Sequence, residues 1–416
     1  MRSPLGIFIF VSIMLLMDAY IFQAVKFVSH SASPRSKSIV NFIYWAVVIL
    51  AVAIFIMLLL TENTFLPGIV RTYLFATIIG LFLAKISVIF FLLIDDVRRI
   101  VQWVAEKILP HKKTLEALPD NGISRSVFLS WLGLAAGGSL FTSLLYGFKN
   151  KYNYDVKSVQ LAFENLPASF KGMKILQISD IHSGSFTNKE AVEHGVQKML
   201  KENADLILFT GDLVNDMAIE MKPYMDVFRQ LKAPMGVYSI LGNHDYGDYK
   251  KWPVNGLTQE QNLINLQQVH AKMGWQLLMN EHVALEKNGE KIALLGIENW
   301  SAKKRFPKHG RLDLAHAGTE DYPFKILMSH DPSHWDAQVR KDYPSIDLML
   351  SGHTHGMQFG LELPFFKWSP VQYIYKQWAG LYEAGPQKLY VNRGFGFLGY
   401  PGRVGILPEI TVIELI

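Results

Sequence analysis

Four long apolar runs in the first 150 residues constrain this chain more than any other feature. They extend over residues 5–25, 40–60, 70–93 and 127–148. A transmembrane helix needs about 20 mostly apolar residues to cross the hydrocarbon core of a bilayer. Four such runs are too many for the core of one soluble domain. The sequence therefore predicts an all-α transmembrane bundle of four spans over residues 1–150 and a globular domain over residues 151–416.

Lysine and arginine are unevenly distributed between the connections of these spans. The first connection contains Lys26, Arg35 and Lys37, residues 61–68 contain none, and residues 95–126 contain six. Cytoplasmic connections carry the excess of positive charge, so the first and third are predicted to face the cytoplasm. Four spans then make the globular domain extracytoplasmic, in a protein integral to a bacterial cytoplasmic membrane.

Two ionisable residues, Asp18 and Lys85, interrupt the apolar runs. In this topology both lie about 20 Å of helix from the outer end of their span. They either pair with each other or extend separately towards the cytoplasmic headgroups. Further along, residues 96–109 have apolar positions at helical spacing among charged ones. We interpret them as an amphipathic helix at the membrane surface, followed by a polar loop.

The composition excludes several kinds of site and partner. The chain has no cysteine, which excludes disulfides, zinc–thiolate sites and thiol nucleophiles. Its net charge is +5 and the sequence has no basic stripe, so no nucleic-acid partner is expected.

Five short apolar runs in the globular domain each end at Asp, Asn or His. They are Met173–Ser179 before Asp180 and His182, Leu206–Thr210 before Asp212, Gly236–Leu241 before Asn243, His244 and Asp245, Lys325–Ser329 before His330, and Ile346–Ser351 before His353 and His355. Such runs predict strands that are covered on both faces. Helical stretches at Lys189–Asn203 and Met221–Leu231 favour parallel βαβ units. Because the carboxyl ends of parallel strands open into one crevice, we expect these polar residues to meet there.

This combination of Asp, Asn and His is a donor set for two divalent metal ions. Mixed oxygen and imidazole ligands suit Mn, Fe or Zn. Two such ions about 3.5–4 Å apart activate a bridging hydroxide and hold a phosphoryl group during in-line displacement. A single Asp-x-His or Gly-Asp motif is usually an ordinary turn, whereas five in this order favour hydrolysis of a phosphate ester.

The motif order D-x-H, G-D, G-N-H-D, H and G-H-T-H resembles the calcineurin-like metallophosphoesterase superfamily over residues 172–416. Within it, Gly356-Met357-Gln358 and residues 391–396 resemble the membrane-associated YkuE/YaeI-like phosphodiesterase branch. The resemblance implies an α/β domain of four αββα layers with two packed sheets.

The resemblance also implies a role for each motif residue. The implied ligands are Asp180, His182 and His355 for the first metal and Asn243, His330 and His353 for the second, with Asp212 bridging both. His244 is implied to be a catalytic histidine that stabilises the transition state or protonates the leaving oxygen. Asp245 is expected to orient His244. Residue 215 is Asn where relatives commonly carry Asp, which leaves the bridging carboxylate intact.

Residues 359–382 are rich in aromatic residues. They form either an insertion that packs on its own domain or a membrane-facing loop. With the membrane spans, this stretch favours a lipid-linked or cell-envelope phosphodiester as the substrate. Arg393 is a candidate phosphate clamp, or a loop cap.

Two other functions stay open at this stage. One is a phosphodiesterase for a soluble nucleotide or sugar phosphate, with the helices as an anchor only. The other is a non-catalytic membrane scaffold. We interpret six further histidines as surface or loop residues: His194, His270, His282, His309, His316 and His334.

Overall fold

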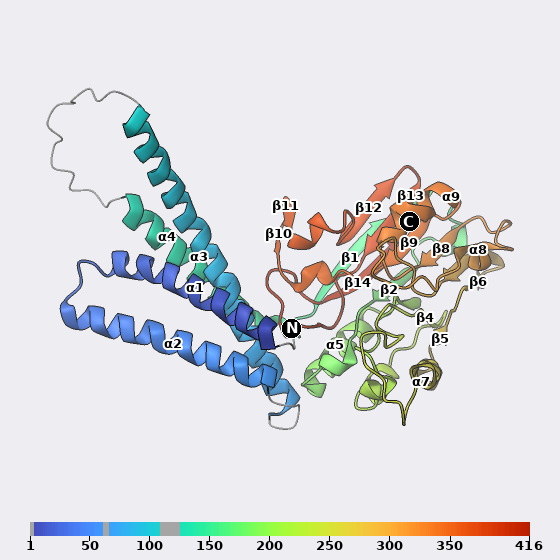
Figure 1. Ribbon diagram of the computed structural model, residues 1–416. Helices are drawn as coiled ribbons and strands as arrows, with labels where there is room; N and C mark the ends of the chain where they lie inside the picture. Colours follow the sequence, from blue (N-terminus) through green and yellow to red (C-terminus); the bar gives the residue numbers. More distant parts are fainter. Residues whose placement is uncertain (1–3, 61–65, 109–124) are drawn as a thin grey trace. The chain divides into compact units, whose positions relative to one another are not determined.

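The computed structural model describes residues 4–60, 66–108 and 125–416 of the chain. The chain divides into two compact units, Met1–Tyr146 and Gly147–Ile416 (Figure 1). In the described residues, the first unit is entirely helical, and the strands all belong to the second.

Four helices occupy the first unit, the last of them extending four residues into the second, and each is long and apolar enough to cross a membrane. They are α1 (Pro4–Val28), α2 (Pro34–Leu60), α3 (Gly68–Ile108) and α4 (Arg125–Asn150). The prediction of four spans is confirmed. Large apolar side chains such as Phe8 and Phe42 are 70% and 75% exposed, as expected for helices solvated by lipid.

The helix α3 differs from the expectation. The third span and residues 96–108 of the amphipathic segment form one continuous helix of 41 residues. It is about 62 Å long, roughly twice the hydrocarbon thickness. No proline or glycine lies between residues 81 and 108 to break it, and Asp95 pairs with Arg98 one turn later at 2.7 Å. Most of the predicted polar loop lies outside the described residues.

Asp18 of α1 and Lys85 of α3 form a buried ion pair. Lys85 Nζ lies 2.8 Å from the Asp18 carboxylate. The Tyr44 hydroxyl of α2 donates to the Asp18 carbonyl at 2.8 Å and to its carboxylate at 3.2 Å. The two residues therefore pair rather than extend separately to the headgroups, and this polar contact joins three helices.

The second unit contains two six-stranded sheets. In order across the first sheet, its strands are β1 (Asp155–Leu161), β14 (Glu409–Leu415), β2 (Lys174–Ile178), β3 (Leu206–Phe209), β4 (Val237–Ser239) and β5 (Gln276–Leu277). The strands β2 to β5 are parallel, and β14 runs antiparallel to β2. The predicted parallel units therefore form one side of this sheet.

The second sheet has a parallel centre and antiparallel edges. In order, its strands are β12 (Gly380–Ala384), β13 (Gln387–Val391), β9 (Leu348–Ser351), β8 (Lys325–Met328), β7 (Glu290–Gly296) and β6 (Glu281–Lys287). The strands β13, β9, β8 and β7 are parallel. A separate hairpin of β10 (Leu361–Leu363) and β11 (Phe366–Trp368) belongs to neither sheet.

Both sheets are apolar on both faces, which explains their unbroken hydrophobic runs. In β2, Ile175 faces the core between the sheets, and its neighbour Leu176 faces the outer core under the helices. In β9, Leu348 and Met349 divide in the same way. Because successive side chains point to opposite faces, each run fills two cores. The domain is the expected four-layered αββα sandwich (Figure 1).

Helices cover the outer faces of the sandwich. The first sheet is covered by α5 (Lys189–Lys201), α6 (Met225–Phe228) and α7 (Gln259–Met273), and the second by α8 (Leu312–His316) and a π-helical turn (Trp335–Val339). The short helix α9 (Arg340–Asp342) follows this turn and has no buried residue. α5 agrees closely with its predicted range and begins at Asn188, whose side chain accepts from Ala191 N. The predicted helix 221–231 is shorter, because only residues 225–228 are α-helical.

Candidate metal centre

The carboxyl ends of β2, β3 and β4 in one sheet meet those of β8 and β9 in the other. Asp180 N donates to the Gly211 carbonyl at 2.9 Å, which joins two strand ends of the first sheet. Gln177 Nε2 donates to the Ser351 carbonyl at 2.9 Å, which joins the two sheets. The sequence-based expectation of one crevice in a single sheet is therefore incomplete, because the polar residues come from two sheets.

The first cluster consists of Asp180, His182 and His355. One donor atom of each lies within 4.8 Å of the others, and all three residues are buried. The Nε2 atoms of the two histidines are 3.1 Å apart, and His355 Nε2 lies 3.2 Å from Asp180 Oδ1.

The second cluster consists of Asp212, His330 and His353, again with donor atoms within 4.8 Å of one another. His330 Nε2 lies 3.1 Å from Asp212 Oδ2 and 3.3 Å from His353 Nδ1. Asp212 Oδ2 is also 3.5 Å from His182 Nε2 of the first cluster. One carboxylate is thus within reach of both clusters.

Asn243 adds an amide oxygen beside the second cluster. Its neighbour His244 donates its backbone N–H to Asp212 Oδ1 at 2.8 Å. The Asn243 Nδ2 donates to the Tyr249 hydroxyl at 2.9 Å, whereas its Oδ1 is buried and has no hydrogen-bond partner among the described residues. A buried carbonyl oxygen without a donor is costly, and a cation would satisfy it.

The charges of both clusters suit divalent cations. Burial alone would raise the pKa of Asp212, yet His330 and its other histidine neighbours hold that pKa well below its usual range. Burial lowers the pKa of His182 to about 3, so its ring is neutral at pH 7. Burial opposes protonation of His330, but Asp212 raises its pKa to about 10. A cation at the second cluster must displace that proton, because a ligand histidine is neutral.

Backbone strain concentrates at these residues. Asp180, His182, Asp212, His353 and His355 all have left-handed backbones, with φ between 48° and 71°. Non-glycine residues adopt this conformation at a cost and persist in it mainly at functional sites. The turns that leave the strands therefore aim these side chains at the expense of backbone stability.

His244 lies beside the first cluster, with its ring centroid 5.0 Å from that of His182. Its Nδ1 is 2.8 Å from the Asn215 carbonyl oxygen. A carbonyl only accepts hydrogen bonds, so Nδ1 carries a hydrogen. Asn215 thus orients His244 through its backbone carbonyl, while its side chain donates to the Ser185 hydroxyl.

The Asp245 carboxylate makes no hydrogen bond to the His244 ring among the described residues, so its expected role in orienting that ring stays a prediction. Its carboxylate accepts the backbone N–H groups of Gly242, Asp212 and Leu213 at 2.8–2.9 Å. Burial, with repulsion from Asp212, raises the pKa of Asp245 to about 7. The physical role of this residue is to hold the turns after β3 and β4 together.

Arg393 is 3% exposed and lies between two carboxylates. Its guanidinium pairs with Glu409 and lies 2.6 Å from Glu362 of the hairpin. This environment favours the structural alternative of the two sequence-based interpretations, and the phosphate-clamp role stays a prediction. Nearby, Arg403 is fully buried and donates to the carbonyls of Arg393 and Gly394, with Nη2 3.3 Å from His355 Nδ1.

The sequence did not identify the tyrosines that support the clusters. Tyr375 places its hydroxyl 2.8 Å from His353 Nε2, and Tyr249 accepts from Asn243. Ligand histidines usually have such a partner on the other ring nitrogen. Tyr249 follows the Gly-Asn-His-Asp motif closely and Tyr375 lies in the aromatic-rich stretch, but neither position belongs to a motif, so no local pattern marks it as a supporting residue. Conversely, His270 and His334, interpreted as surface or loop residues, are fully buried.

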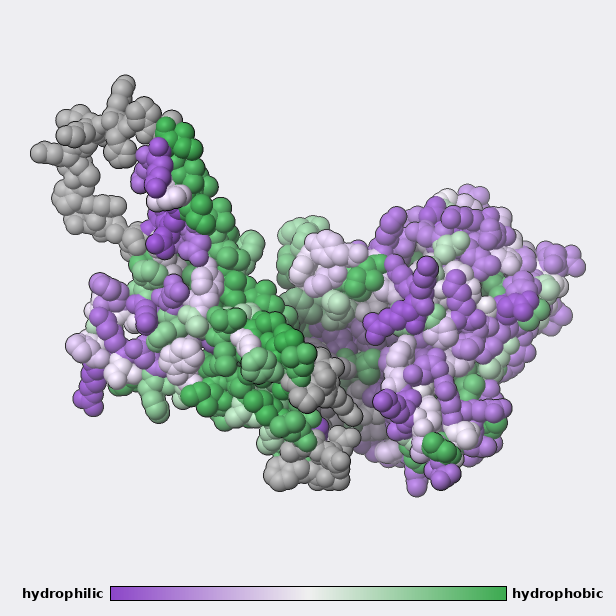
Figure 2. Space-filling view, in the orientation of Figure 1, coloured by the Kyte–Doolittle hydropathy of each residue, from purple (hydrophilic) through white to green (hydrophobic). Residues whose placement is uncertain are grey.

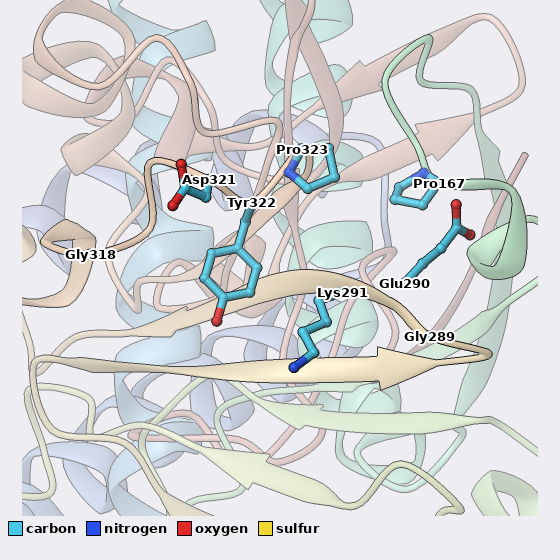
Figure 3. A pocket seen from close by; sticks show the side chains of 8 residues that line it. All are labelled: Pro167, Gly289, Glu290, Lys291, Gly318, Asp321, Tyr322 and Pro323. Carbon is cyan, nitrogen blue, oxygen red and sulfur yellow. The ribbon is translucent and has the colours of Figure 1, made fainter.

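One surface pocket of the second unit lies away from the clusters (Figure 3). It is lined by Pro167, Gly289, Glu290, Lys291, Gly318, Asp321, Tyr322 and Pro323. Its last two residues precede the amino end of β8, whereas His330 follows the carboxyl end. The pocket therefore lies at the opposite end of the strands from the metal-capable residues.

Comparisons with known proteins agree with this geometry. Residues 1–151 match a family described as "Probable Calcineurin-like phosphoesterase, transmembrane domain". Residues 173–357 match the family "Calcineurin-like phosphoesterase". The two matches fall on the two structural units.

Individual relatives include bacterial and vertebrate proteins. The uncharacterized metallophosphoesterase YkuE of Bacillus subtilis is 30% identical over 308 residues, which cover 70% of this chain and 98% of YkuE. The phosphodiesterase YaeI of Escherichia coli is 28% identical and covers 71% of this chain and 100% of its own. A zebrafish (Danio rerio) transmembrane protein with a metallophosphoesterase domain is 29% identical over 321 residues, which cover 74% of this chain and 67% of that protein. The chain therefore belongs to the calcineurin-like metallophosphoesterase family, and it is a phosphoester hydrolase integral to a membrane.

Proposed function

We propose that this protein hydrolyses a phosphodiester at a binuclear metal site formed by the two clusters. The observation that carries the proposal is the position of Asp212, which lies within 3.5 Å of a histidine nitrogen in each cluster. Asp180, His182 and His355 would hold one ion, and Asn243, His330 and His353 the other, with Asp212 shared. When bound, two divalent ions would stabilise the charge on the phosphoryl oxygens as Lewis acids. They would also lower the pKa of a bound water, so that hydroxide is available at neutral pH.

His244 is the proposed general acid. The Asn215 carbonyl fixes the Nδ1 hydrogen, so Nε2 is the ring nitrogen that exchanges a proton. As the bond from phosphorus to the leaving oxygen breaks, the proton on Nε2 passes to that oxygen. Proton transfer of this kind contributes about 10²- to 10⁴-fold to a rate.

The test is metal-dependent hydrolysis of bis-p-nitrophenyl phosphate by the full-length protein. Asp212→Ala should lose both bound metal and activity, because it removes the shared carboxylate. His244→Ala should retain metal and lose about 10²- to 10⁴-fold in kcat. His194→Ala, an exposed residue of α5, is the matched control and should behave as the parent. Activity that survives both site substitutions would refute the assignment.

The proposed substrate is a lipid-linked or cell-envelope phosphodiester. It is supported by the four membrane spans and by the name phosphodiesterase that the relative YaeI carries. A soluble nucleotide or sugar phosphodiester is the alternative, with the helices as an anchor only. Turnover of micellar phospholipid, compared with that of a soluble aryl diester, separates the two: a preference for the soluble compound would favour the alternative.

The catalytic unit is proposed to face away from the cytoplasm. Four spans return both ends of the helical unit to one side, and the lysine and arginine distribution puts its first and third connections in the cytoplasm. The chain has no cysteine, so single-cysteine variants report their side unambiguously. In cells whose outer envelope is permeabilised, an impermeant maleimide should label Lys171→Cys and spare Ser31→Cys. The reverse pattern would invert the topology.

A further inference from the structure

The β10–β11 hairpin exposes an apolar patch that the sandwich does not cover. Phe365 at its turn is 87% exposed, and Tyr373 just after it is 77% exposed. The other exposed apolar members of the patch are Met357, Leu361, Leu363, Phe366 and Ile374. Figure 2 shows green and white surface over the hairpin, where most of the second unit is purple. A patch of this kind on a soluble domain usually marks an interaction surface.

Contacts within the second unit fix the β10–β11 hairpin in the position that exposes its apolar side chains. Below the hairpin, a small core contains Tyr375 and Trp378, so these aromatic residues do pack on their own domain. The hairpin itself is fixed by polar contacts at its base: Glu362 pairs with Arg393, and Lys367 donates to the Ala379 carbonyl. These contacts hold the apolar side chains outward instead of letting them collapse onto the sandwich.

The base of the hairpin is attached to the end of the membrane helix α4. Arg403 N donates to the Gly147 carbonyl in the last turns of α4 at 2.9 Å, and Asn150 Nδ2 donates to the Arg403 carbonyl at 3.2 Å. The next residue, Val404, accepts from Gly360 N at 2.9 Å, immediately before β10. Gly147 and Asn150 belong to the second unit and are among the last residues of α4, which is a candidate span, so the contacts to Arg403 connect the base of the hairpin to the segment of the second unit that directly follows the membrane unit in the chain.

The chain on both sides of the hairpin leads to the two clusters. The hairpin lies in the sequence between His355 of the first cluster and Tyr375, whose hydroxyl contacts His353 of the second. A cationic loop adjoins it: Lys303 Nζ donates to the Ile374 carbonyl at 2.9 Å, and the Phe306 ring lies 4.8 Å from that of His353. Two further cations of this loop, Lys304 and Arg305, are exposed.

We infer that the hairpin, with Tyr373 and Ile374, inserts into the interface of the bilayer that holds the four helices. Exposed aromatic and aliphatic side chains bind the boundary between headgroups and acyl chains. The cations at positions 303–305 would meet anionic headgroups beside the clusters. This inference rests on the proposed function and deepens it: the substrate is a phosphodiester whose acyl chains stay in the bilayer.

The first experiment measures insertion without using catalysis. A nitrobenzoxadiazole label is placed on Phe365→Cys, or on Val254→Cys as a control, since Val254 is 100% exposed elsewhere in the same unit. In vesicles of phosphatidylcholine and phosphatidylglycerol, doxyl-labelled lipid should quench the label at 365 and spare the label at 254. Equal quenching at the two positions would overturn the inference.

The second experiment links insertion to turnover. The double variant Phe365→Ser, Phe366→Ser is compared with the parent on hexadecyl p-nitrophenyl phosphate in vesicles and on soluble bis-p-nitrophenyl phosphate. We expect about a tenfold loss on the lipid diester and unchanged turnover of the soluble one. Equal effects on the two substrates would contradict the inference and leave the proposed function intact. A parent protein inactive on both would instead defeat the proposed function.

Discussion

Buried charge is handled differently in the two units of this protein. In the membrane unit, one acid meets one base: Lys85 lies 2.8 Å from Asp18, and Tyr44 donates to the same carboxylate. In the catalytic unit, imidazole nitrogens lie close to each other: the Nε2 atoms of His182 and His355 are 3.1 Å apart. The two clusters contain two carboxylates, those of Asp180 and Asp212. The first group is balanced within itself, and the second has more ligand atoms than its own hydrogens can satisfy.

The difference separates a structural from a functional use of polar residues. A balanced pair inside apolar helices offsets the cost of its own desolvation and joins α1 to α3. A cluster of lone pairs needs an external cation, and its residues are held in strained left-handed backbones that packing alone would not select. The contrast predicts that substitutions in the clusters change kcat and bound metal, whereas equivalent substitutions in the ion pair change stability.

The largest expected effect is that of Asp212→Asn on catalysis. Loss of one charge shared by both clusters should reduce kcat by about a thousandfold or more, since even residues behind the ligands are worth about 10- to 100-fold. Elemental analysis of the purified protein should show less bound metal. The matched change Asp18→Asn should leave kcat and metal content unchanged. Comparable losses of activity in the two variants would abolish the distinction.

Asp18→Asn should instead lower the stability of the helical unit. Removing one partner of a buried pair costs about 3–5 kcal/mol, because the other charge remains uncompensated. The change Lys85→Met should therefore restore part of the loss when it is added to Asp18→Asn. Thermal unfolding of the two single variants and the double variant in detergent measures the coupling. Strictly additive effects would show that the coupling energy between Asp18 and Lys85 is zero.

His270 represents a third case, a buried ionisable group without a partner. Both ring nitrogens lack a hydrogen bond among the described residues, and burial lowers the pKa to about 3. The unfolded chain, with a pKa near 6.5, takes up a proton that the native state does not. Stability is therefore complete above about pH 6.5 and falls as the pH decreases.

The decrease in the free energy of unfolding that protonation of His270 causes should reach about 2 kcal/mol at pH 5. His270→Leu removes the proton uptake and should reduce the difference in melting temperature between pH 7 and pH 5. His194→Leu on the exposed face of α5 is the control and should not reduce it. An unchanged difference in the His270 variant would mean that this ring is not the source of acid sensitivity.

The smallest effects should come from the two tyrosines. Tyr44→Phe removes a bond to Asp18 and should cost about 1 kcal/mol of stability without changing metal affinity. Tyr375→Phe removes the hydroxyl next to His353 and should weaken metal binding about 10-fold with little effect on unfolding. Metal titration by calorimetry and thermal unfolding compare the two variants. Weaker metal binding in Tyr44→Phe, or a loss of stability without weaker metal binding in Tyr375→Phe, would contradict the separation of the two roles.

Much of the fold could be predicted because its signals are local. Transmembrane helices satisfy their own backbone, so length and hydropathy identified four spans. Runs such as residues 206–209 are apolar at every position because both faces are buried, and the residues that follow them supplied the candidate ligands. The paired Asp18 and Lys85 could be proposed because equal depth in two helices is readable from residue number. The continuity of α3 was missed, because polarity alone suggested a boundary that no helix-breaking residue provides.

Other features depended on contacts between distant segments. Asp245 follows His244 directly in sequence, yet its carboxylate binds backbone N–H groups more than 30 residues away. Arg393, for which the sequence left a phosphate clamp and a loop cap open, pairs with Glu362 of the hairpin, a residue 31 positions away. Tyr375 reaches His353 from a loop without a motif.

The sequence by itself determined the membrane spans, the strands and the residue types that follow them, because burial and chain geometry impose these patterns locally. The tertiary structure alone decided that the candidate ligands come from two sheets, which tyrosines and carbonyls contact them, and which aromatic side chains remain exposed. Those outcomes depend on side-chain directions and on pairings across long sequence separations, and neither is encoded in a local pattern.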